Sequence, residues 1–446
     1  MALISKTFSS AGNRKTWTWS AWLKIIGDTS KNYTLMTQVD GWAANGNAGF
    51  YLNGESLQAY NFLSNVNAGT SSRVSTTAYL RDPNAWYHVV LRFDTTQSSA
   101  SDRVRWYING ELQTDLAHAN YPSQNFDANF NTAAAHGIGR HTDSNTYPYE
   151  GAMSHIHFCD GYSYAPTEFG ETDSTTGIWK IKTSPSVSYG TNGFFILKDG
   201  NSVTDQSGQS NDWTVSAGTV TDLKDNPSNN YATLNHLDNY YQADTLSNVN
   251  LTMVGGGQYA HRTASIGLDT GKWYWEIQTN NFESSDQTCL GISSEVANAA
   301  NYEFYNQSGN NVGYGYFSNG SGYGNGGTIF TGYGSASGTH TIGVALDLDN
   351  NKIAWSYDGT WQGSADPANG TNMISITAPS SLKTGTYFPA FTQKTNTRTL
   401  NVNFGNGYFG TTAISSAGSN GNGSLFEYDV PSGYYALNTK NINTYG

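Results

Sequence analysis

The feature that most constrains the fold of this chain is a run of alternating apolar and polar residues at positions 341–361, TIGVALDLDNNKIAWSYDGTW. Successive side chains of a β-strand point to opposite faces, so this period of two predicts strands on both sides of a polar turn at 349–351. Asp358 and Gly359 then supply a tight hairpin turn. The predicted core face of the run consists of Ile342, Val344, Leu346, Ile353 and Trp355.

The composition extends this prediction to the whole chain. The sequence holds 30 Tyr, 12 Trp and 49 Gly, and no long stretch has the apolar 3.6-residue period of a helix. At 446 residues, a prior of roughly 150 residues per domain allows two or three domains. We therefore predict an all-β fold: two antiparallel β-sandwich (jelly-roll) domains joined by a partly β-structured bridge.

The second half of the chain carries several separated motifs in a recognisable order. They are GKWYWEIQ at 271–278, LGIS at 290–293, the run at 341–361, and YFPAF followed by LNVNFG within 387–405. Together they resemble a SPRY domain over most of residues 231–437. The resemblance implies a two-sheet sandwich that recognises partners with its loops and is not an enzyme. We assign residues 231–446 to this domain and a C-terminal tail.

The first half carries strand-like segments with one apolar side each. TWTWSAWLK at 16–24, AWYHVVLRFD at 85–94 and VRWYING at 104–110 are followed by YEGAMSHIHFCDG at 149–161. This order resembles the laminin-G-like and pentraxin-like branch of the concanavalin A-like sandwiches. The resemblance implies a jelly-roll domain over residues 1–172, of a kind that usually binds glycans or proteins.

A bridging segment at 173–230 contains the strand-like stretches GFFILKDG and NDWTVSAG, and we expect it to pack on the flanking sandwiches. Oxygen-bearing side chains gather in its middle, of the kind that calcium prefers. Turns of this composition also form without metal in all-β proteins, so calcium is the secondary interpretation and no other cofactor is predicted. The candidate ligands are Asp199, Asn201, Asp205 and Asp212.

Charge and composition weigh against several partners. The net charge is −12 and no cluster of Lys or Arg occurs, which argues against nucleic acid and against an anionic membrane surface. The start of the chain has no apolar segment of signal-peptide type, and no run is long enough to insert into a membrane, so we expect synthesis in a cytoplasm. Cys159 and Cys289 are interpreted as buried apolar residues.

Catalytic motifs are missing from the sequence. It has no Gly-x-Ser-x-Gly elbow, no phosphate loop and no strand with alternating acidic residues, so we predict that the protein is not an enzyme. Glu276 is interpreted as a structural acid. His155 and His157 are two apart on a predicted strand, which is a possible metal-ligand geometry, but we interpret them as solvent-facing polar positions.

The strongest binding candidate is the Gly-rich stretch at 310–338, NNVGYGYFSNGSGYGNGGTIFTGYGSASG. Aromatic rings stack on sugars or proteins, while Asn and Ser give adaptable hydrogen bonds. Tyr314 and Tyr316 are expected in a core strand. The preferred exposed set is Asn319, Tyr323, Asn325 and Tyr333, and an inert loop or a subunit contact is the alternative.

Three phrases extend the resemblance over nearly the whole chain: FSSAGNRKTWTWSAW at 8–22, YGTNGFFILKDGNSVTDQSGQSNDWT at 189–214 and YALNT at 435–439. This arrangement resembles modular structural proteins of tailed bacteriophages, particularly those of marine bacteria. The resemblance implies a non-enzymatic virion protein, of tail-fibre, appendage or receptor-binding type, that recognises host-surface glycan or protein. It also implies other virion proteins as partners and a homo-oligomeric state. The alternatives are a purely architectural capsid or tail decoration and a polysaccharide depolymerase.

Overall fold

The structure, a computed structural model, confirms the all-β class, with 44% of the residues in strands and 5% in helices. It describes the residues in these ranges: 2–25, 31–39, 48–53, 56–60, 72–142, 147–198, 202–238, 240–241, 244–285, 287–295, 304, 312–324, 327–395 and 397–446.

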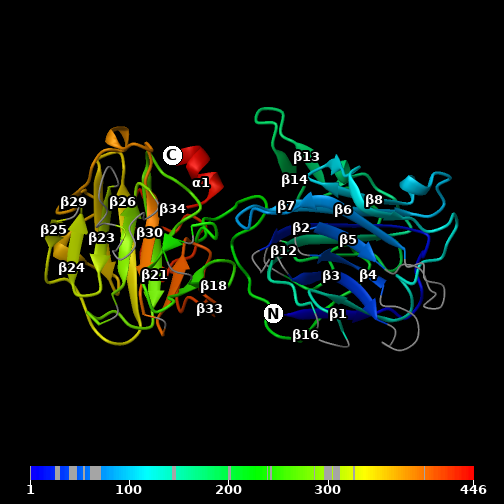
Figure 1. Cartoon of the computed structure of the whole chain (residues 1–446), viewed down its shortest axis with the longest axis horizontal. Coiled ribbons are helices and arrows are strands. Elements are labelled where there is room, and N and C mark those ends of the chain that lie inside the picture. Colours follow the sequence, from blue (N-terminus) through cyan, green and yellow to red (C-terminus); the bar gives the residue numbers. More distant parts are fainter. Residues whose placement is uncertain are drawn as a thin grey trace. The chain divides into compact units, whose positions relative to one another are not determined.

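The chain folds into two compact units (Figure 1). Unit 1 comprises Met1–Asp222 with Asn226–Ser228, and unit 2 comprises Leu223–Asp225 with Asn229–Gly446. Each unit contains two large sheets and its own buried core.

Unit 1 is built from an eight-stranded and a six-stranded sheet. The eight-stranded sheet has the order β10 (Leu116–Asn120), β6 (Arg73–Tyr79), β5 (Ser56–Tyr60), β4 (Ala48–Asn53), β3 (Asn32–Val39), β11 (Ala135–Ile138), β1 (Leu3–Thr7) and β16 (Thr214–Ala217). The six-stranded sheet has the order β15 (Phe194–Ile196), β12 (Gly151–Asp160), β2 (Thr16–Ile25), β7 (Tyr87–Asp94), β8 (Val104–Ile108) and β9 (Glu111–Leu112). A hairpin and two short 3-10 turns complete it: β13 (Gly170–Thr172), β14 (Trp179–Ile181), η1 (Ala100–Asp102) and η2 (Pro166–Glu168).

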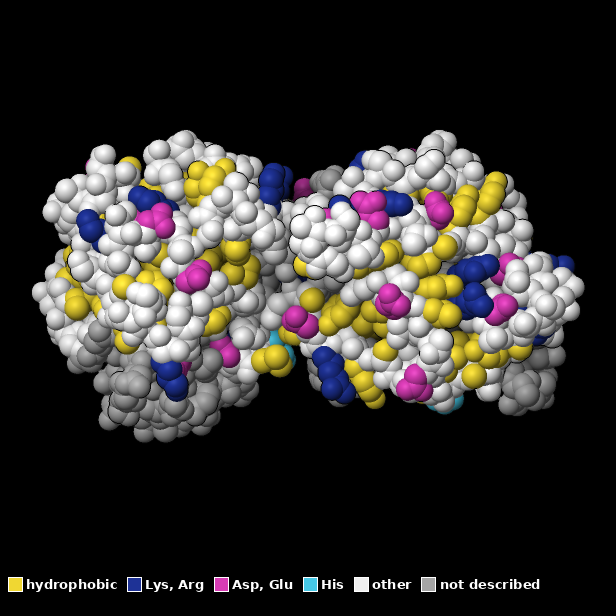
Figure 2. Space-filling model, turned by 90° about the horizontal axis from the view of Figure 1, so that it is seen from above, with side chains coloured by type: hydrophobic (Ala, Val, Ile, Leu, Met, Phe, Trp, Pro, Cys, Tyr) yellow, Lys and Arg dark blue, Asp and Glu magenta, His cyan; other side chains and the backbone are white. Residues whose placement is uncertain are grey.

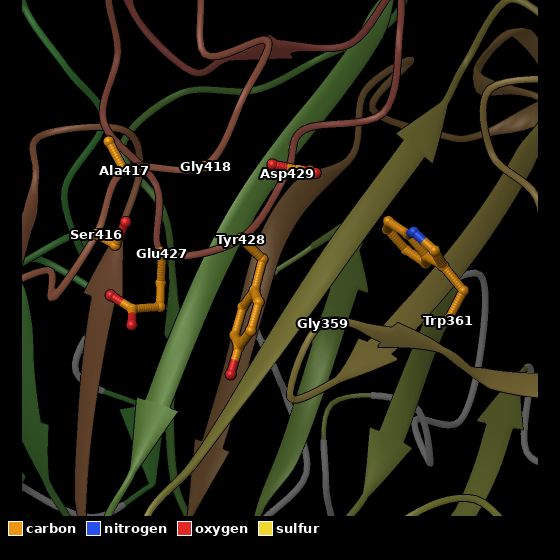
Figure 3. Close-up of a pocket in the computed structure, with 8 residues that line it drawn as sticks. All are labelled: Gly359, Trp361, Ser416, Ala417, Gly418, Glu427, Tyr428 and Asp429. Atoms are coloured by element: carbon orange, nitrogen blue, oxygen red, sulfur yellow. The ribbon is translucent and has the colours of Figure 1, made fainter.

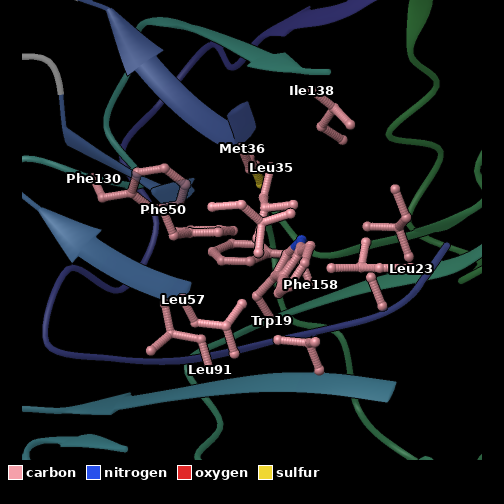
Figure 4. Close-up of a cluster of buried hydrophobic side chains, with 14 of the residues drawn as sticks. Trp19, Leu23, Leu35, Met36, Phe50, Leu57, Leu91, Phe130, Ile138 and Phe158 are labelled. Atoms are coloured by element: carbon pink, nitrogen blue, oxygen red, sulfur yellow. The ribbon is translucent and has the colours of Figure 1, made fainter. Parts of the chain in front are cut away.

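The core of unit 1 lies between the two sheets (Figure 4). Trp17 and Trp19 alternate on the inner face of β2 and are fully buried, as their spacing predicts. The ring of Trp17 stacks on Phe93 of the neighbouring strand β7, with centroids 4.7 Å apart. Phe50 enters from β4 of the opposite sheet and lies 4.9 Å from Trp19. Interlocking aromatic rings from both sheets therefore hold the sandwich together.

Residues 173–230 were expected to form a bridge packed on the sandwiches. In the structure they supply one strand to each sheet of unit 1, because β15 pairs with β12 and β16 pairs with β1. Trp213, just before β16, is buried in the unit 1 core. Most of this segment is thus part of the first sandwich.

Unit 2 is built from a seven-stranded and a nine-stranded sheet. The seven-stranded sheet has the order β17 (Tyr240–Tyr241), β20 (Ala260–Thr263), β30 (Phe388–Gln393), β22 (Cys289–Ser293), β23 (Gly313–Phe317), β24 (Ser321–Gly324) and β25 (Gly327–Phe330). The nine-stranded sheet has the order β18 (Thr245–Ser247), β19 (Thr252–Val254), β31 (Thr399–Asn403), β21 (Lys272–Thr279), β26 (His340–Asp347), β27 (Lys352–Tyr357) and β28 (Thr360–Trp361), with β29 (Ile374–Ser375) beside β27 and β34 (Tyr435–Ala436) beside β21. The remaining elements are β32 (Tyr408–Phe409), β33 (Thr412–Ala413), η3 (Gln362–Ser364), η4 (Pro379–Ser381) and α1 (Thr439–Tyr445).

The alternating run at 341–361 forms β26, β27 and β28. Val344 pairs with Trp355 across the first hairpin, and both side chains lie in the core between the sheets. Asp358 and Gly359 turn the chain into β28 with φ angles of 46° and 77°, the positive values that a primed hairpin turn needs. The predicted core alternation and the predicted turn are both confirmed.

The outer face of the nine-stranded sheet is covered by a C-terminal segment, residues 426–436. Ala345 of β26 and Tyr274 of β21 pack there with Phe426 and Tyr434 in a second apolar cluster. Position 343 has room only for glycine, since a Cβ there would collide with the Tyr274 side chain. The sheet is therefore buried on both sides, and the cover brings residues from the end of the chain beside β28.

Entry and exit of unit 2 lie side by side. Tyr231 forms an antiparallel bridge with Asn438, and the Ala232 amide donates to the Leu437 carbonyl at 2.9 Å. Asn438 also caps α1, because its side chain accepts a hydrogen bond from the Asn441 amide. The two ends of the unit thus close on each other.

The surface carries few charges. On the face that Figure 2 shows, Lys, Arg, Asp and Glu side chains form separate spots between larger uncharged areas. Within the described ranges, no helix has the length and apolar character needed to cross a membrane.

Candidate functional site

Two of the predicted binding residues lie together on the outer face of the seven-stranded sheet. Tyr323 of β24 pairs with Gly315 of β23, on the same face as Phe317, and contacts that ring edge-on at 6.1 Å. The Asn319 amide donates to the Tyr323 hydroxyl at 3.3 Å. Asn319 is exposed and Tyr323 is half-buried, so this pair can reach a ligand.

Tyr333 is not part of that pair. Its ring stacks on Phe330 with centroids 3.7 Å apart and meets the buried Tyr316 edge-on at 5.7 Å. Tyr316 points into the core, whereas Tyr323 lies on the opposite face of the same sheet. The ring of Tyr333 thus lies apart from that of Tyr323, although the Tyr333 amide donates to the carbonyl of Gly320, next to Asn319, at 2.9 Å. Asn325 lies outside the described residues.

Asp205, from the predicted calcium set, organises a turn of unit 1. Its Oδ1 accepts hydrogen bonds from the amides of Phe195 and Ser207, and its Oδ2 accepts from the Asn211 amide and the Ser207 hydroxyl, all at 2.8–2.9 Å. Asp212 accepts from the Asp205 amide at 2.8 Å. These bonds give both carboxylates a role in shaping the turn. Asp199 and Asn201 lie outside the described residues.

His155 and His157 are buried, and their interpretation as solvent-facing residues was wrong. The register of β12 shifts between Ser154 and His157, and His155 has a φ of 49°, so a bulge interrupts the regular alternation. The ring of His157 stacks on Phe195 of β15, with centroids 3.9 Å apart. The segment that precedes β15 covers this histidine. Among the described residues, no three His, Cys, Asp or Glu side chains are grouped to hold a metal ion.

Both cysteines are buried, as predicted, and neither is part of a disulfide. Burial raises the pKa of the Cys159 thiol, which favours its unreactive protonated form.

A hollow lies in unit 2, where the C-terminal cover meets β28 (Figure 3). Its volume is about 500 Å³. Two aromatic side chains, Trp361 and Tyr428, stand in it, and both are half-buried. The lining comprises Gly359, Trp361, Ser416, Ala417, Gly418, Glu427, Tyr428 and Asp429.

Each aromatic residue of the hollow is positioned by the fold. Trp361 ends β28 and packs edge-on against the buried Tyr274, with ring centroids 6.3 Å apart. Tyr428 lies over Gly359, where a Cβ would collide with its ring. The glycine of the hairpin turn therefore serves twice, since it permits the positive φ and makes room for Tyr428.

The carboxylic acids that line the hollow are Glu427 and Asp429. Glu427 accepts hydrogen bonds from the amide and the hydroxyl of Ser415, the former at 2.8 Å. Asp429 accepts from the Ser419 amide at 2.6 Å, and this bonding lowers the pKa of Asp429, which is therefore ionised at neutral pH. The hollow combines aromatic faces with negative charge.

Beneath the wall of the hollow lies Glu276, on β21, with no exposed surface. Its Oε1 accepts from the Tyr428 amide at 2.8 Å and from the Tyr274 hydroxyl at 3.0 Å, and its Oε2 accepts from the Glu427 amide at 2.8 Å. Asn403 approaches Oε2 at 3.5 Å. Burial raises the pKa of Glu276 to about 7, although the two amides oppose this shift.

Sequence reasoning did not find this hollow. The signal was a Ser-, Gly- and Asn-rich stretch that ends in a tyrosine between two acids, SSAGSNGNGSLFEYDVP at 415–431. Its partner, Trp361, lies more than fifty residues earlier, at the end of the run that defined the fold. Only the folding of the C-terminal cover onto β28 brings the two together.

Comparison with known families supports the architecture of unit 1. Residues 5–167 match the concanavalin A-like lectin/glucanases superfamily, in its laminin-G form. This match covers less than half of the chain and agrees with the jelly-roll sandwich described above. The sequence matches none of the curated proteins.

Solved structures similar to the chain include sandwiches of both expected kinds. The SPRY domain of human HERC1 is 15% identical, with 36% of this chain and 92% of that chain covered and a TM-score of 0.28. Mouse laminin alpha1 domains LG4-5 are 10% identical, with 88% and 81% covered and a TM-score of 0.28. A pentraxin from Limulus polyphemus is 14% identical, with 37% and 72% covered and a TM-score of 0.27. Because these TM-scores are low, the fold is defined by the strand order and register described above.

Proposed function

We propose that this chain is a non-enzymatic surface protein of a bacteriophage virion that binds host-surface glycan through the loops of its β-sandwiches. Its partners are other virion proteins and a receptor on the host, and it acts as a homo-oligomer in the virion. The assignment to a virion is supported by the three segments that resemble bacteriophage structural proteins, at 8–22, 189–214 and 435–439.

The observation that carries the binding role is the hollow of unit 2. Trp361 and Tyr428 offer flat apolar faces of the kind that stack on the C–H face of a sugar ring. Glu427 and Asp429 place acceptors beside them for hydroxyl or amino groups. The hollow thus holds two aromatic side chains beside polar and acidic groups, and its volume of about 500 Å³ is within the usual size range of a small-ligand site.

In this proposal the hollow binds glycan and catalyses no reaction. The carboxylates of the hollow are bonded to Ser415 and Ser419, which fixes their positions and keeps Asp429 ionised. A glycosidase acid needs the opposite, a carboxyl group kept protonated beside the scissile bond. Release of reducing ends from host polysaccharide by the purified protein would contradict this part of the proposal.

A glycan array tests the proposal, with the full-length protein on a panel of neutral, amino-bearing and acidic oligosaccharides. We expect wild type to bind a subset of the panel, and Trp361→Ala and Tyr428→Ala to weaken that binding at least tenfold. Tyr162→Ala is the control, since Tyr162 is an exposed tyrosine of unit 1, 41% accessible, far in sequence from the hollow. Its binding should match wild type.

The same panel compares the hollow with the pair on β24. If Asn319→Ala and Tyr323→Ala abolish binding while the two hollow variants bind normally, the ligand site is on the outer face of the seven-stranded sheet. Localisation in a virion reconstruction decides between receptor recognition and an architectural role. A copy sealed between other virion proteins would exclude receptor recognition.

A further inference from the structure

We propose that Glu276 is the positioning residue of the ligand site: its buried carboxylate holds the wall of the hollow by binding the amides of Glu427 and Tyr428. This inference rests on the proposed function of the hollow, and it assigns a specific task to a residue that touches no ligand.

The geometry of the wall supports this assignment. Each carboxylate oxygen of Glu276 takes one amide of two successive wall residues, at 2.8 Å in both cases. Two consecutive amides on one carboxylate fix the local backbone. Glu427 and Tyr428 both line the hollow, so this grip holds the backbone from which their side chains project, while Ser415 binds the carboxylate of Glu427.

Other bonds hold the wall on both sides of this point: the Gly418 amide donates to the Phe426 carbonyl at 2.9 Å, the Val430 amide donates to the Ser419 carbonyl at 3.0 Å, and Ser415 binds the Glu427 side chain. Asn403 binds the Leu425 carbonyl at 2.9 Å, and the Ser419 amide binds Asp429, so bonds flank the pair on both sides. For the amides of Glu427 and Tyr428 themselves, the acceptor is Glu276. A side chain from β21, some 150 residues earlier, therefore takes the place of a strand partner for these two amides.

The choice of a carboxylate is otherwise costly. Its donors are two backbone amides, the Tyr274 hydroxyl and the Asn403 amide, all of them neutral. A buried charge with neutral partners alone opposes folding, and an apolar residue would suit the sheet better. Breaches of this kind gather at functional sites, where a group serves binding at the expense of stability. The two successive amides of the wall need two acceptors at one point, and a carboxylate supplies both.

Glu276→Gln tests the inference. Glutamine keeps the size of the side chain but turns one acceptor into an N–H₂ donor that faces a wall amide. We expect hydrogen exchange at the Glu427 and Tyr428 amides to accelerate at least tenfold, while exchange within β26 changes less than twofold. Binding to the glycan panel should weaken at least tenfold. A general loss of stability would instead accelerate exchange in β26 and the wall together.

Tyr274→Phe is the matched control. It removes a donor to the same oxygen of Glu276 but leaves both amide bonds in place, so exchange at the two wall amides should stay within twofold of wild type. Equal acceleration in Tyr274→Phe and Glu276→Gln would overturn the inference.

Wild-type exchange keeps the test decisive if Glu276→Gln does not fold. The Glu427 and Tyr428 amides should exchange at least a hundredfold more slowly than in an unstructured peptide, and exchange at unstructured rates would overturn the inference. If the two hollow variants abolish binding while Glu276→Gln binds and exchanges as wild type, the proposed function stands and this inference falls. If wild type binds no glycan but Glu276→Gln frees the two amides, the wall assignment stands and the glycan proposal falls.

Discussion

The indole N–H of Trp179 donates a hydrogen bond to Nδ1 of His88 at 3.0 Å. An indole nitrogen can only donate, so Nδ1 is the acceptor and the neutral imidazole carries its proton on Nε2, 2.9 Å from the Ser20 hydroxyl. Burial lowers the pKa of His88 to about 3, which keeps it neutral. One uncharged histidine thus ties the β13–β14 hairpin to the six-stranded sheet of unit 1.

Replacing Trp179 by Phe should lower the free energy of unfolding by about 1–3 kcal/mol, because His88 then keeps a buried acceptor without its donor. Urea unfolding of the full chain measures the change. Ile178→Ala is the control in the same hairpin, since Ile178 is 65% exposed and its loss should change the free energy by less than about 0.5 kcal/mol. Equal effects would mean that the hydrogen bond contributes nothing.

Unit 1 should lose stability in mild acid. Burial lowers the pKa of His88 to about 3 and that of His136 to about 4, whereas the unfolded chain has a value near 6.5. Below pH 6.5 the unfolded state binds more protons, so stability falls with pH, by about 2 kcal/mol per histidine at pH 5. Urea unfolding of wild type and His88→Gln at pH 5 and pH 8 measures this loss. The variant should lose less than wild type between the two pH values.

Glu276 should act with the opposite sign. Its pKa is about 7 in the folded protein, whereas the usual pKa of a glutamate is 4.5, so the folded state binds the extra proton between these values. The stability that it contributes is complete below about pH 4.5 and is lost as pH rises through 7, a change of about 3 kcal/mol. Urea unfolding of wild type and Glu276→Gln across this pH range measures the loss, which the variant should lack. A variant that shows the wild-type pH slope would rule out Glu276 as its source.

Two leucines should differ widely in their contribution to stability, because Leu346 is on the core face of the run at 341–361 and Leu237, outside that run, is exposed. Leu346 is fully buried between the sheets of unit 2, whereas Leu237 is 75% exposed. Leu346→Ala should cost about 2–5 kcal/mol of unfolding free energy because it leaves a cavity. Leu237→Ala should change that free energy by less than about 0.5 kcal/mol. Chemical denaturation of both variants under identical conditions provides the comparison.

The acidic lining of the hollow predicts a preference among sugars. Asp429 is ionised at neutral pH, so amino-bearing glycans should bind more tightly than their neutral counterparts, and added salt should weaken only the former. Asp429→Asn should remove this difference while neutral glycans still bind. Stronger binding of acidic glycans by wild type would contradict the expected role of the charge.

Regular alternation made much of the fold predictable. Trp17 and Trp19 stand two positions apart on one strand, Ile353 and Trp355 stand two apart on another, and all four lie in the cores, as a period of two requires. The histidines of β12 show where that reasoning fails. A bulge between Ser154 and His157 and a cover over the sheet are tertiary features, and neither leaves a mark in the local pattern.

The candidate site was harder to predict for a related reason. Tyr323 and Tyr333 stand in one Gly-rich stretch and look equivalent, but Tyr323 lies on the outer face of β24, whereas Tyr333, beyond the end of β25, packs against the core between the sheets. The hollow, by contrast, depends on Trp361 and Tyr428 from distant segments. Local composition identifies residues that could bind a ligand, and only long-range packing decides which of them meet.

The bridge between Tyr231 and Asn438 has a consequence for how unit 2 could be inherited. A unit whose entering and leaving segments are neighbours, about 5 Å apart where they pair, fits into a surface loop without stretching the protein that receives it. Such a unit can be transferred between proteins as a whole. One insertion event would transfer the unit, with its hollow intact, from one scaffold to another, whereas the same change by point substitution would need many steps.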